Sequence, residues 1–278
     1  APIDWAWVRQ AHEQAGGAAL DEEDMEEAQA ELLRVNLLQV TGAQMAQRYQ
    51  VHPLVQAFFA VKLGELAEAE GLQRGFAQAM TAVAQTVPQA VTVAVRARVT
   101  EAVPHMEEVA VQWTEALEGT DKLWCCIGLA RFYESLSQWQ DAERCYQRSL
   151  TVSQTQLGTR HPSTASSLNN LAGLYRSQGR YGEAEPLYIE ALEIRKTELG
   201  DRHPSTAISL NNLAGLYRSQ GRYGEAEPLY IEALEISKTE LGDRHPDTAL
   251  SLNNLAALYD SQGRYGEAEP LYIEALEI

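Results

Sequence analysis

Apolar residues recur every three or four positions through most of the chain, which is the spacing of amphipathic helices. From about Ser163 to Gln178, one such stripe carries Leu168, Leu171, Ala172 and Tyr175. A second stripe starts near Gly182 and carries Ala184, Leu187, Tyr188, Ala191, Leu192 and Ile194. Gly179 lies between them, where a left-handed helix cap needs no side chain. The pattern therefore predicts a pair of helices joined by a short turn.

The same helix pair is written three times. The dipeptides His161-Pro162, His203-Pro204 and His245-Pro246 fix a period of 42 residues, which is typical of a solenoid of stacked units. Moving back by one period places Leu129-Ala130 under Leu171-Ala172 and Tyr133 under Tyr175. Residues 119–160 are therefore a fourth, divergent copy, in which Cys126 and Cys145 occupy packing positions.

These packing residues resemble those of the tetratricopeptide repeat. The matching positions are Leu168, Leu171, Ala172, Tyr175, Gly179, Tyr181, Ala184, Tyr188 and Ala191. The period and the motifs LNNLA, QGRY and EAEPLY are most similar to the kinesin-light-chain subgroup, which is also abundant in bacterial multidomain proteins. The resemblance implies an all-α, right-handed superhelical solenoid with repeats at 119–160, 161–202, 203–244 and 245–278.

The few differences between the copies concentrate on the first helix. Repeats 161–202 and 203–244 differ only at Ser166/Ile208 and Arg195/Ser237. The last copy differs from the one before it at Ser205/Asp247, Ile208/Leu250, Gly215/Ala257 and Arg218/Asp260. At 100° per residue the last four positions form one stripe of the first helix. Neutral drift at exposed positions after recent duplication would give the same picture.

The resemblance implies that first helices line a concave groove, so we expect the varying stripe to be the wall of a peptide-binding groove. The expected groove residues are Ser166, Asn169, Asn170, Gly173, Arg176, Ile208, Asn211, Asn212, Gly215, Arg218, Leu250, Asn253, Asn254, Ala257 and Asp260.

Residue chemistry suggests what such a groove would hold. The asparagine amide offers both a donor and an acceptor to the main chain of an extended peptide. The resemblance carries this role to the second Asn of each LNNLA motif, namely Asn170, Asn212 and Asn254. Hydrogen bonding between repeats is the alternative role for these amides. Arg176 and Arg218 could pair with a ligand carboxylate, and Asp260 breaks that series.

Residues 1–58 follow a different pattern. Glu22–Asn36 predicts a helix, and residues 37–40 and 48–51 predict two short strands before a helix from about Pro53, the outline of a winged helix. RYQVHPLVQAFFAVKL resembles the end of the winged-helix domain of STAND-type (NB-ARC) signalling NTPases. The resemblance implies that His52 senses nucleotide phosphates, with Pro53 standing where the family has Asp. A histidine at a strand-to-helix junction before Pro is the structural alternative.

No phosphate-cradling G-x-x-x-x-G-K-[ST] loop occurs, so we expect the chain itself to be no enzyme. If the parent protein is such an NTPase, we expect its nucleotide-binding core to lie upstream of this chain. Residues 59–118 predict helices split by Pro88 and Pro104, which would connect to the divergent repeat and cap it.

Composition narrows the class of partner. The net charge of −17 argues against nucleic-acid binding. The sequence lacks an apolar run long enough to predict a membrane-spanning helix. The three cysteines, Cys125, Cys126 and Cys145, lack zinc spacing and predict reduced, buried thiols in a cytoplasmic protein. Equivalent histidines of stacked repeats are too far apart to share a metal. We therefore expect a protein or peptide partner without metal or cofactor. The alternative is a scaffold that associates through an uncapped last repeat.

Overall fold

The computed structural model describes residues 2–3, 38–41, 48–51 and 69–278. The chain divides into two compact units, Ala1–Cys145 and Tyr146–Ile278. The first contains β1 (Pro2–Ile3), β2 (Leu38–Thr41), β3 (Arg48–Val51), α4 (Ala69–Gln85), α5 (Val93–Val99), α6 (Val103–Gln112), a 3-10 turn (Thr114–Ala116) and α7 (Asp121–Ser135). Helix α8 (Trp139–Gln156) crosses the boundary. The second contains α9 (Pro162–Ser177), α10 (Tyr181–Leu199), α11 (Pro204–Ser219), α12 (Tyr223–Glu240), α13 (Pro246–Ser261) and α14 (Tyr265–Leu276).

The two strands expected near the N-terminus are present and pair with each other. Strands β2 and β3 are antiparallel, with Leu38 opposite Val51 and Thr41 opposite Arg48. The other edge of β3 pairs with β1, which the sequence did not predict. The expected helix at Glu22–Asn36, the helix from about Pro53 and the candidate phosphate sensor His52 lie outside the described residues. The winged-helix interpretation therefore stays a prediction.

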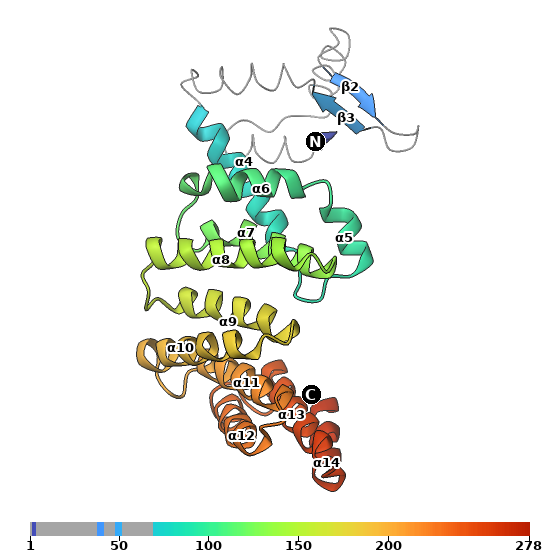
Figure 1. The fold of residues 1–278 in the computed structure, drawn as a ribbon, viewed down its shortest axis with the longest axis vertical. Coiled ribbons are helices and arrows are strands. Elements are labelled where there is room, and N and C mark those ends of the chain that lie inside the picture. Colours follow the sequence, from blue (N-terminus) through green and yellow to red (C-terminus); the bar gives the residue numbers. More distant parts are fainter. Residues whose placement is uncertain (1, 4–37, 42–47, 52–68) are drawn as a thin grey trace. The chain divides into compact units, whose positions relative to one another are not determined.

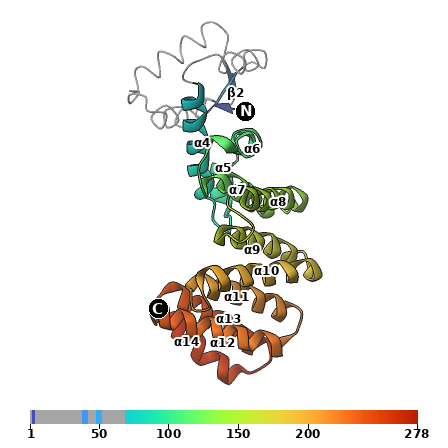
Figure 2. The same ribbon diagram turned by 90° about the vertical axis from the view of Figure 1, so that its left-hand side faces the viewer.

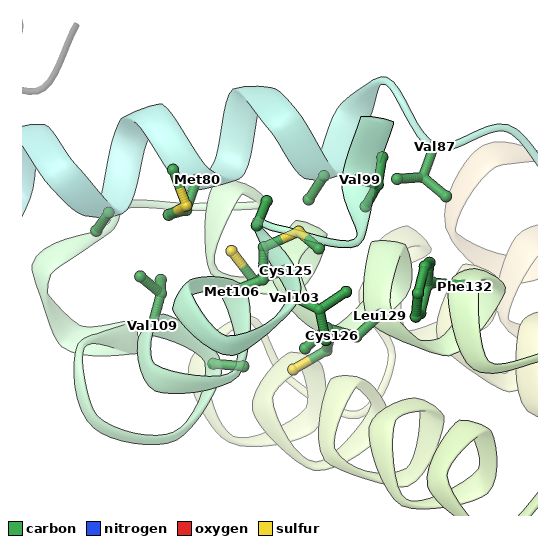
Figure 3. Close-up of a cluster of buried hydrophobic side chains, with 14 of the residues drawn as sticks. Met80, Val87, Val99, Val103, Met106, Val109, Cys125, Cys126, Leu129 and Phe132 are labelled. Atoms are coloured by element: carbon green, nitrogen blue, oxygen red, sulfur yellow. The ribbon is translucent and has the colours of Figure 1, made fainter. Parts of the chain in front are cut away.

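The core of the first unit forms where α4 and α6 pack on α7. Figure 3 shows Met80 of α4 and Met106 of α6 facing Cys125 and Leu129 of α7, all of them fully buried. An ideal Cβ placed on Gly128 would lie only 2.9 Å from the Cβ of Ala84, so the close approach of α7 to α4 requires glycine.

The cysteines of the first unit match the expected buried thiols in part. Cys125 and Cys126 are buried, whereas Cys145 is only partly buried, and none of the three forms a disulfide bond with a described residue. Burial raises the pKa of Cys125 to about 12, and its hydrogen bond with Thr81 only partly opposes this rise. Burial also raises the pKa of Cys145 to about 12. Cys125 and Cys145 are therefore protonated packing groups at neutral pH.

The second unit consists of three helix pairs, α9/α10, α11/α12 and α13/α14 (Figure 1). Helices α10 and α12 each pack both on the first helix of their own pair and on the first helix of the next pair, whereas α14 packs on α13. Ala172 and Ala184 are fully covered, and Tyr188 and Tyr230 are almost fully buried, as the stripe pattern predicts. Figure 2 shows the same succession of pairs from a second direction.

Pro186 interrupts the backbone hydrogen bonding of α10. Helix α10 begins at Tyr181, so Pro186 lies in its second turn rather than in its first. Its missing N–H cannot bond to the carbonyl of Gly182, and the helix still continues to Leu199. The tertiary packing of Ala184 and Tyr188 on either side outweighs the loss of one hydrogen bond.

The loop that enters each first helix is closed by its histidine and threonine. Nδ1 of His203 accepts a hydrogen bond of 3.0 Å from the backbone N–H of Ser205, so the histidine side chain is the N-cap of α11. The hydroxyl of Thr206 donates to the carbonyl of Gly200 at 2.8 Å. The same two bonds recur at the other repeats, through His161 and Thr164 and through His245 and Thr248. The repeated histidines are therefore capping residues.

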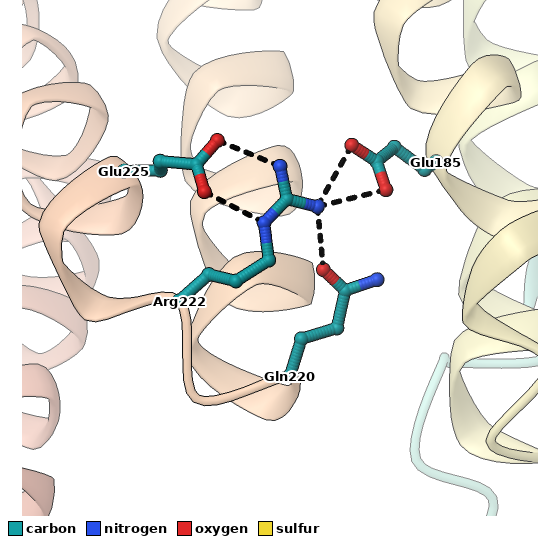
Figure 4. Close-up of polar contacts among 4 residues, drawn as sticks. All are labelled: Glu185, Gln220, Arg222 and Glu225. Atoms are coloured by element: carbon teal, nitrogen blue, oxygen red, sulfur yellow. Dashed lines mark hydrogen bonds and ion pairs between the residues drawn. The ribbon is translucent and has the colours of Figure 1, made fainter.

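An arginine joins each of the last two repeats to the one before it. The guanidinium of Arg222 stacks 4.0 Å from the ring centre of Tyr217 and donates from Nε and Nη2 to the carboxylate of Glu225 at 2.7 and 2.6 Å (Figure 4). Its Nη1 donates to both oxygens of Glu185 in the previous repeat, each at 2.9 Å, and to Gln220 at 2.8 Å. These bonds lower the pKa of Glu225. The cluster forms again at Arg264, with Tyr259, Glu267, Glu227 and Gln262.

The turn within each pair depends on a residue with positive φ. Gly179, Gly221 and Gly263 each have φ of +74°, as the left-handed cap predicts. The equivalent residue of the divergent repeat is Ser137, which lies 42 residues before Gly179 and has φ of +57°. Ser137 is the only non-glycine residue with positive φ in the described part of the chain, and its Cβ makes this conformation costly.

We expect Ser137→Gly to stabilise the first unit by about 1 kcal/mol, because glycine adopts positive φ without steric cost. Thermal and urea unfolding would measure the change. Gly179→Ser is the matched reverse substitution and should destabilise by a similar amount. A lower melting temperature for Ser137→Gly would contradict the assignment of strain.

We also expect His203→Ala to lower the free energy of unfolding by about 1 kcal/mol, because α11 loses its N-cap. His203→Asn is the control, since an asparagine oxygen can accept the same backbone hydrogen bond. Equal losses in both variants by urea unfolding would show that the histidine does not act as a cap.

Candidate functional site

The candidate site is the exposed face of the three first helices, α9, α11 and α13. Helix α11 packs against both α9 and α13, so the three faces are neighbours. Equivalent residues therefore appear at regular steps from one helix to the next. We call this surface the asparagine face, and define it by Asn170, Asn212 and Asn254.

The first asparagine of the LNNLA motif joins neighbouring first helices in the two inner repeats. Asn169 is only 7% exposed, and its Nδ2 donates to the hydroxyl of Ser209 on the next first helix at 3.1 Å. Asn211 makes the same bond to Ser251 at 2.9 Å. Both amides are therefore used between repeats, and the expectation that these two residues also line a groove stays a prediction. Asn253, at the same position in the last repeat, is exposed.

The second asparagine has the opposite surroundings. The side chains of Asn170, Asn212 and Asn254 are partly exposed, and none makes a hydrogen bond to a residue that the structure describes. Two adjacent asparagines thus divide two roles that the sequence left open, with the first joining repeats and the second facing outward. Each outward amide presents one acceptor and two donor hydrogens.

Two arginines, Arg176 and Arg218, lie near Tyr230. An ideal Cβ on Gly215 would be 2.6 Å from Nη1 of Arg176 and 3.4 Å from the hydroxyl of Tyr230, so Arg176 crosses onto the next first helix where glycine leaves room. Burial raises the pKa of Tyr230, and the positive charges of Arg218 and Arg176 partly oppose this rise. Both guanidinium groups therefore lie near one tyrosine hydroxyl.

Neither guanidinium makes a hydrogen bond or an ion pair with the described residues, and both side chains are only partly buried. The pair can therefore accept a carboxylate from outside the chain. The junction of α11 and α13 differs, because Ala257 and the exposed Asp260 stand in place of Gly215 and Arg218. Gly173 occupies the position of Gly215 in α9, where an ideal Cβ would lie 3.5 Å from the hydroxyl of Tyr188.

The remaining predicted position holds a small serine in repeat 161–202 and a large aliphatic residue in the next two repeats. Ile208 is 42% exposed and Leu250 is 53% exposed, so both present apolar surface. Ser166 occupies the equivalent position of α9, and its hydroxyl accepts a hydrogen bond of 3.0 Å from Nη2 of Arg195. Arg195 was not among the site residues predicted from the sequence. The sequence did contain a signal for this contact, because positions 166 and 195 are the only two at which repeat 161–202 differs from repeat 203–244.

No group of three or more histidine, cysteine or acidic side chains is arranged to hold a metal ion among the residues described. Within the same residues, every helix is too short or too polar to span a bilayer.

Comparison with known proteins agrees with this architecture. The family model of the tetratricopeptide repeat matches residues 123–197, 163–239 and 205–278, which together make up more than half of the chain and include most of the divergent copy. No curated protein matches the chain in sequence.

Among solved structures, one similar chain is a Podosopora anserina protein assigned as a kinesin light chain, with nearly identical TPR-like repeats. It has 26% identity and a TM-score of 0.53, and the match covers 74% of this chain and 92% of that one. BtubC (BKLC) from P. vanneervenii has 22% identity and a TM-score of 0.51, with coverage of 81% and 84%. A Rap protein complexed with Competence and Sporulation Factor has 15% identity and a TM-score of 0.56, with coverage of 98% and 76%.

The likeness to BtubC and to the Rap protein is one of fold alone. The family match rests on the repeats themselves, whose packing alanines, tyrosines and cap glycines lie where the sequence pattern predicts them. The chain belongs to the tetratricopeptide-repeat family.

Proposed function

We propose that this chain is a protein-binding module whose asparagine face holds an extended peptide segment. The observation that carries the proposal is the division between adjacent asparagines. Asn169 and Asn211 bond the next repeat, whereas Asn170, Asn212 and Asn254 stay partly exposed without a hydrogen bond to the described residues. Such amides can hold the main chain of a segment whatever its side chains are.

The charges on this face suggest a polarity for the bound segment. Arg176 and Arg218 lie near the hydroxyl of Tyr230 and make no ion pair in the described part of the chain. Asp260 stands at the position of Arg218 in the last repeat. A segment with a carboxylate near the junction of α9 and α11, and without one near α13, fits this pattern.

The wider setting of the module is proposed from the N-terminal sequence. The resemblance of RYQVHPLVQAFFAVKL to STAND-type NTPases favours a sensor arm of a larger signalling protein, with His52 as its phosphate sensor. Binding on the repeats would then shift the larger protein's equilibrium only if the ligand prefers one of its states.

The repeats themselves are of a kind that mediates protein interaction rather than catalysis. The neighbouring fold of the Rap protein was solved in complex with Competence and Sporulation Factor. Both facts favour a bound protein segment over a substrate for chemistry.

A scaffold that self-associates is the second function, and one observation favours it. Helix α14 exposes Tyr265 and Leu276, the latter 86% exposed, while the equivalent Tyr223 and Leu234 of the preceding repeat are partly buried. Analytical ultracentrifugation over a range of concentrations would reveal association, and Leu276→Glu should abolish it. A monomer at all concentrations would exclude this function.

In the main test, residues 1–278 are immobilised as bait, and binding peptides are selected from a phage-displayed random library. We expect the triple variant Asn170→Ala, Asn212→Ala and Asn254→Ala to bind a selected peptide at least about tenfold more weakly, because each lost amide bond contributes about 1 kcal/mol. Fluorescence polarisation would measure the affinity.

The control for that test is the triple variant Glu193→Gln, Glu235→Gln and Glu277→Gln, which changes exposed residues near the ends of the second helices. It should bind like the unmodified chain, and circular dichroism should show equal helix content in all three proteins. Unchanged binding by the asparagine variant would move the site away from the asparagine face.

A further inference from the structure

Arg195 is a buried charge whose surroundings contain no opposite charge among the described residues. It lies near the end of α10 and is 6% exposed. Its Nη1 donates to the carbonyl of Ser205 at 2.8 Å and to the hydroxyl of Ser209 at 3.1 Å. Its Nη2 donates to the hydroxyl of Ser166 at 3.0 Å. Every acceptor that this part of the structure supplies is therefore neutral.

The hydrogens that remain are on one edge of the guanidinium group. Nε is buried without a hydrogen-bond partner in the described structure, and Nη2 has one acceptor for two hydrogens. Elsewhere in this chain the same edge holds a carboxylate, since Nε and Nη2 of Arg180 donate to the two oxygens of Glu183 at 2.7 Å each. Arg195 thus presents the geometry that binds a carboxylate in each repeat's arginine cluster, without a carboxylate of its own.

This arrangement is costly for the folded chain. An arginine removed from water needs hydrogen bonds and an opposite charge to offset its desolvation. Burial lowers the pKa of Arg195 to about 10, so the side chain is still charged at neutral pH. The next repeat avoids the cost, because the equivalent Ser237 bonds the carbonyl of Ala233 and contacts the hydroxyl of Ser251.

Ser166, which accepts from Nη2, is small and lies one helical turn before Asn170 on the same side of α9. Ser166 stands at the position of the exposed Ile208 and Leu250. Its hydroxyl accepts from Nη2 of Arg195 and donates to the carbonyl of Pro162 at 3.3 Å. A change of its side-chain rotamer would take the hydroxyl off Nη2 and free that hydrogen for another acceptor. Isoleucine or leucine at the same position would close the guanidinium edge.

We propose that Arg195 is a carboxylate subsite at the junction of α9 and α11, which takes an aspartate or glutamate side chain of the bound segment on its Nε and Nη2 edge. The inference rests on the proposed function, and it names the acidic residue as a specificity determinant of the segment. Because only repeat 161–202 has both Ser166 and Arg195, the subsite occurs once among the three regular repeats.

The double variant Ser166→Ile and Arg195→Ser tests this subsite. It makes repeat 161–202 identical to repeat 203–244, so its sequence is one that already folds in the same chain. Circular dichroism should show the same helix content, and the melting temperature should be equal or higher because an uncompensated buried charge is removed.

The probe is a phage-displayed random-peptide library, selected in parallel with the unmodified chain and with the double variant. We expect peptides from the unmodified chain to share Asp or Glu at one position, and those from the double variant to lack that preference. An individual acidic peptide should bind the double variant about tenfold more weakly. Arg195→Lys should also lose the preference, because lysine keeps the charge but has no planar edge.

Three outcomes would overturn the proposal. The same acidic position in both selections would exclude the subsite and leave the asparagine face intact. Full acidic preference in Arg195→Lys would exclude recognition by the guanidinium edge, and this variant also serves if the double variant does not fold. Failure of the unmodified chain to enrich any peptide would overturn the proposed function and the subsite with it.

Discussion

The structure of the repeats depends on how one arginine side chain is held. Arg222 has its guanidinium on the ring of Tyr217, one edge on Glu225 in its own helix, and its remaining nitrogen on Glu185 in the previous repeat. The exposed parts of such ion pairs contribute little stability by themselves. Their effect is geometric, because the planar group fixes one repeat relative to the next. Each first helix therefore follows the previous one at a set step, and the outward amides follow at the same step.

Much of this architecture could be predicted from the sequence, because periodicity survives without any knowledge of contacts. The 42-residue period, the buried Ala172 and Tyr188, and the positive φ of Gly179 all follow from local patterns. The capping role of His203 could not be predicted in this way, because histidine is not among the usual N-cap residues. The QGRY motif identified the repeat family but did not explain its arginine. The structure explains it, because Arg222 contacts Tyr217, Glu225 and Glu185.

The candidate site was less predictable, because adjacent letters of one motif have different neighbours. Asn169 and Asn170 are the same residue type, and successive helix positions differ by a rotation of about 100°. As a result, Asn169 hydrogen-bonds the next repeat, whereas Asn170 is partly exposed. The contact of Arg195 was hard to predict for a similar reason: the paired differences Ser166/Ile208 and Arg195/Ser237 single the two residues out, but only the structure shows that Arg195 reaches a serine 29 residues earlier. Arg195 and Arg222 also show that one residue type can be fully paired in one place and lack a charged partner among the described residues in another.

The near identity of the repeats has a consequence for any strand bound along them. A strictly periodic surface offers a bound chain several equivalent registers, displaced by one repeat, and such translational degeneracy adds entropy to a complex but no specificity. Ser166 with Arg195 at one end and Ala257 with Asp260 at the other make the registers unequal. A few substitutions between otherwise identical repeats can thus select one register of a bound chain over those displaced by one repeat.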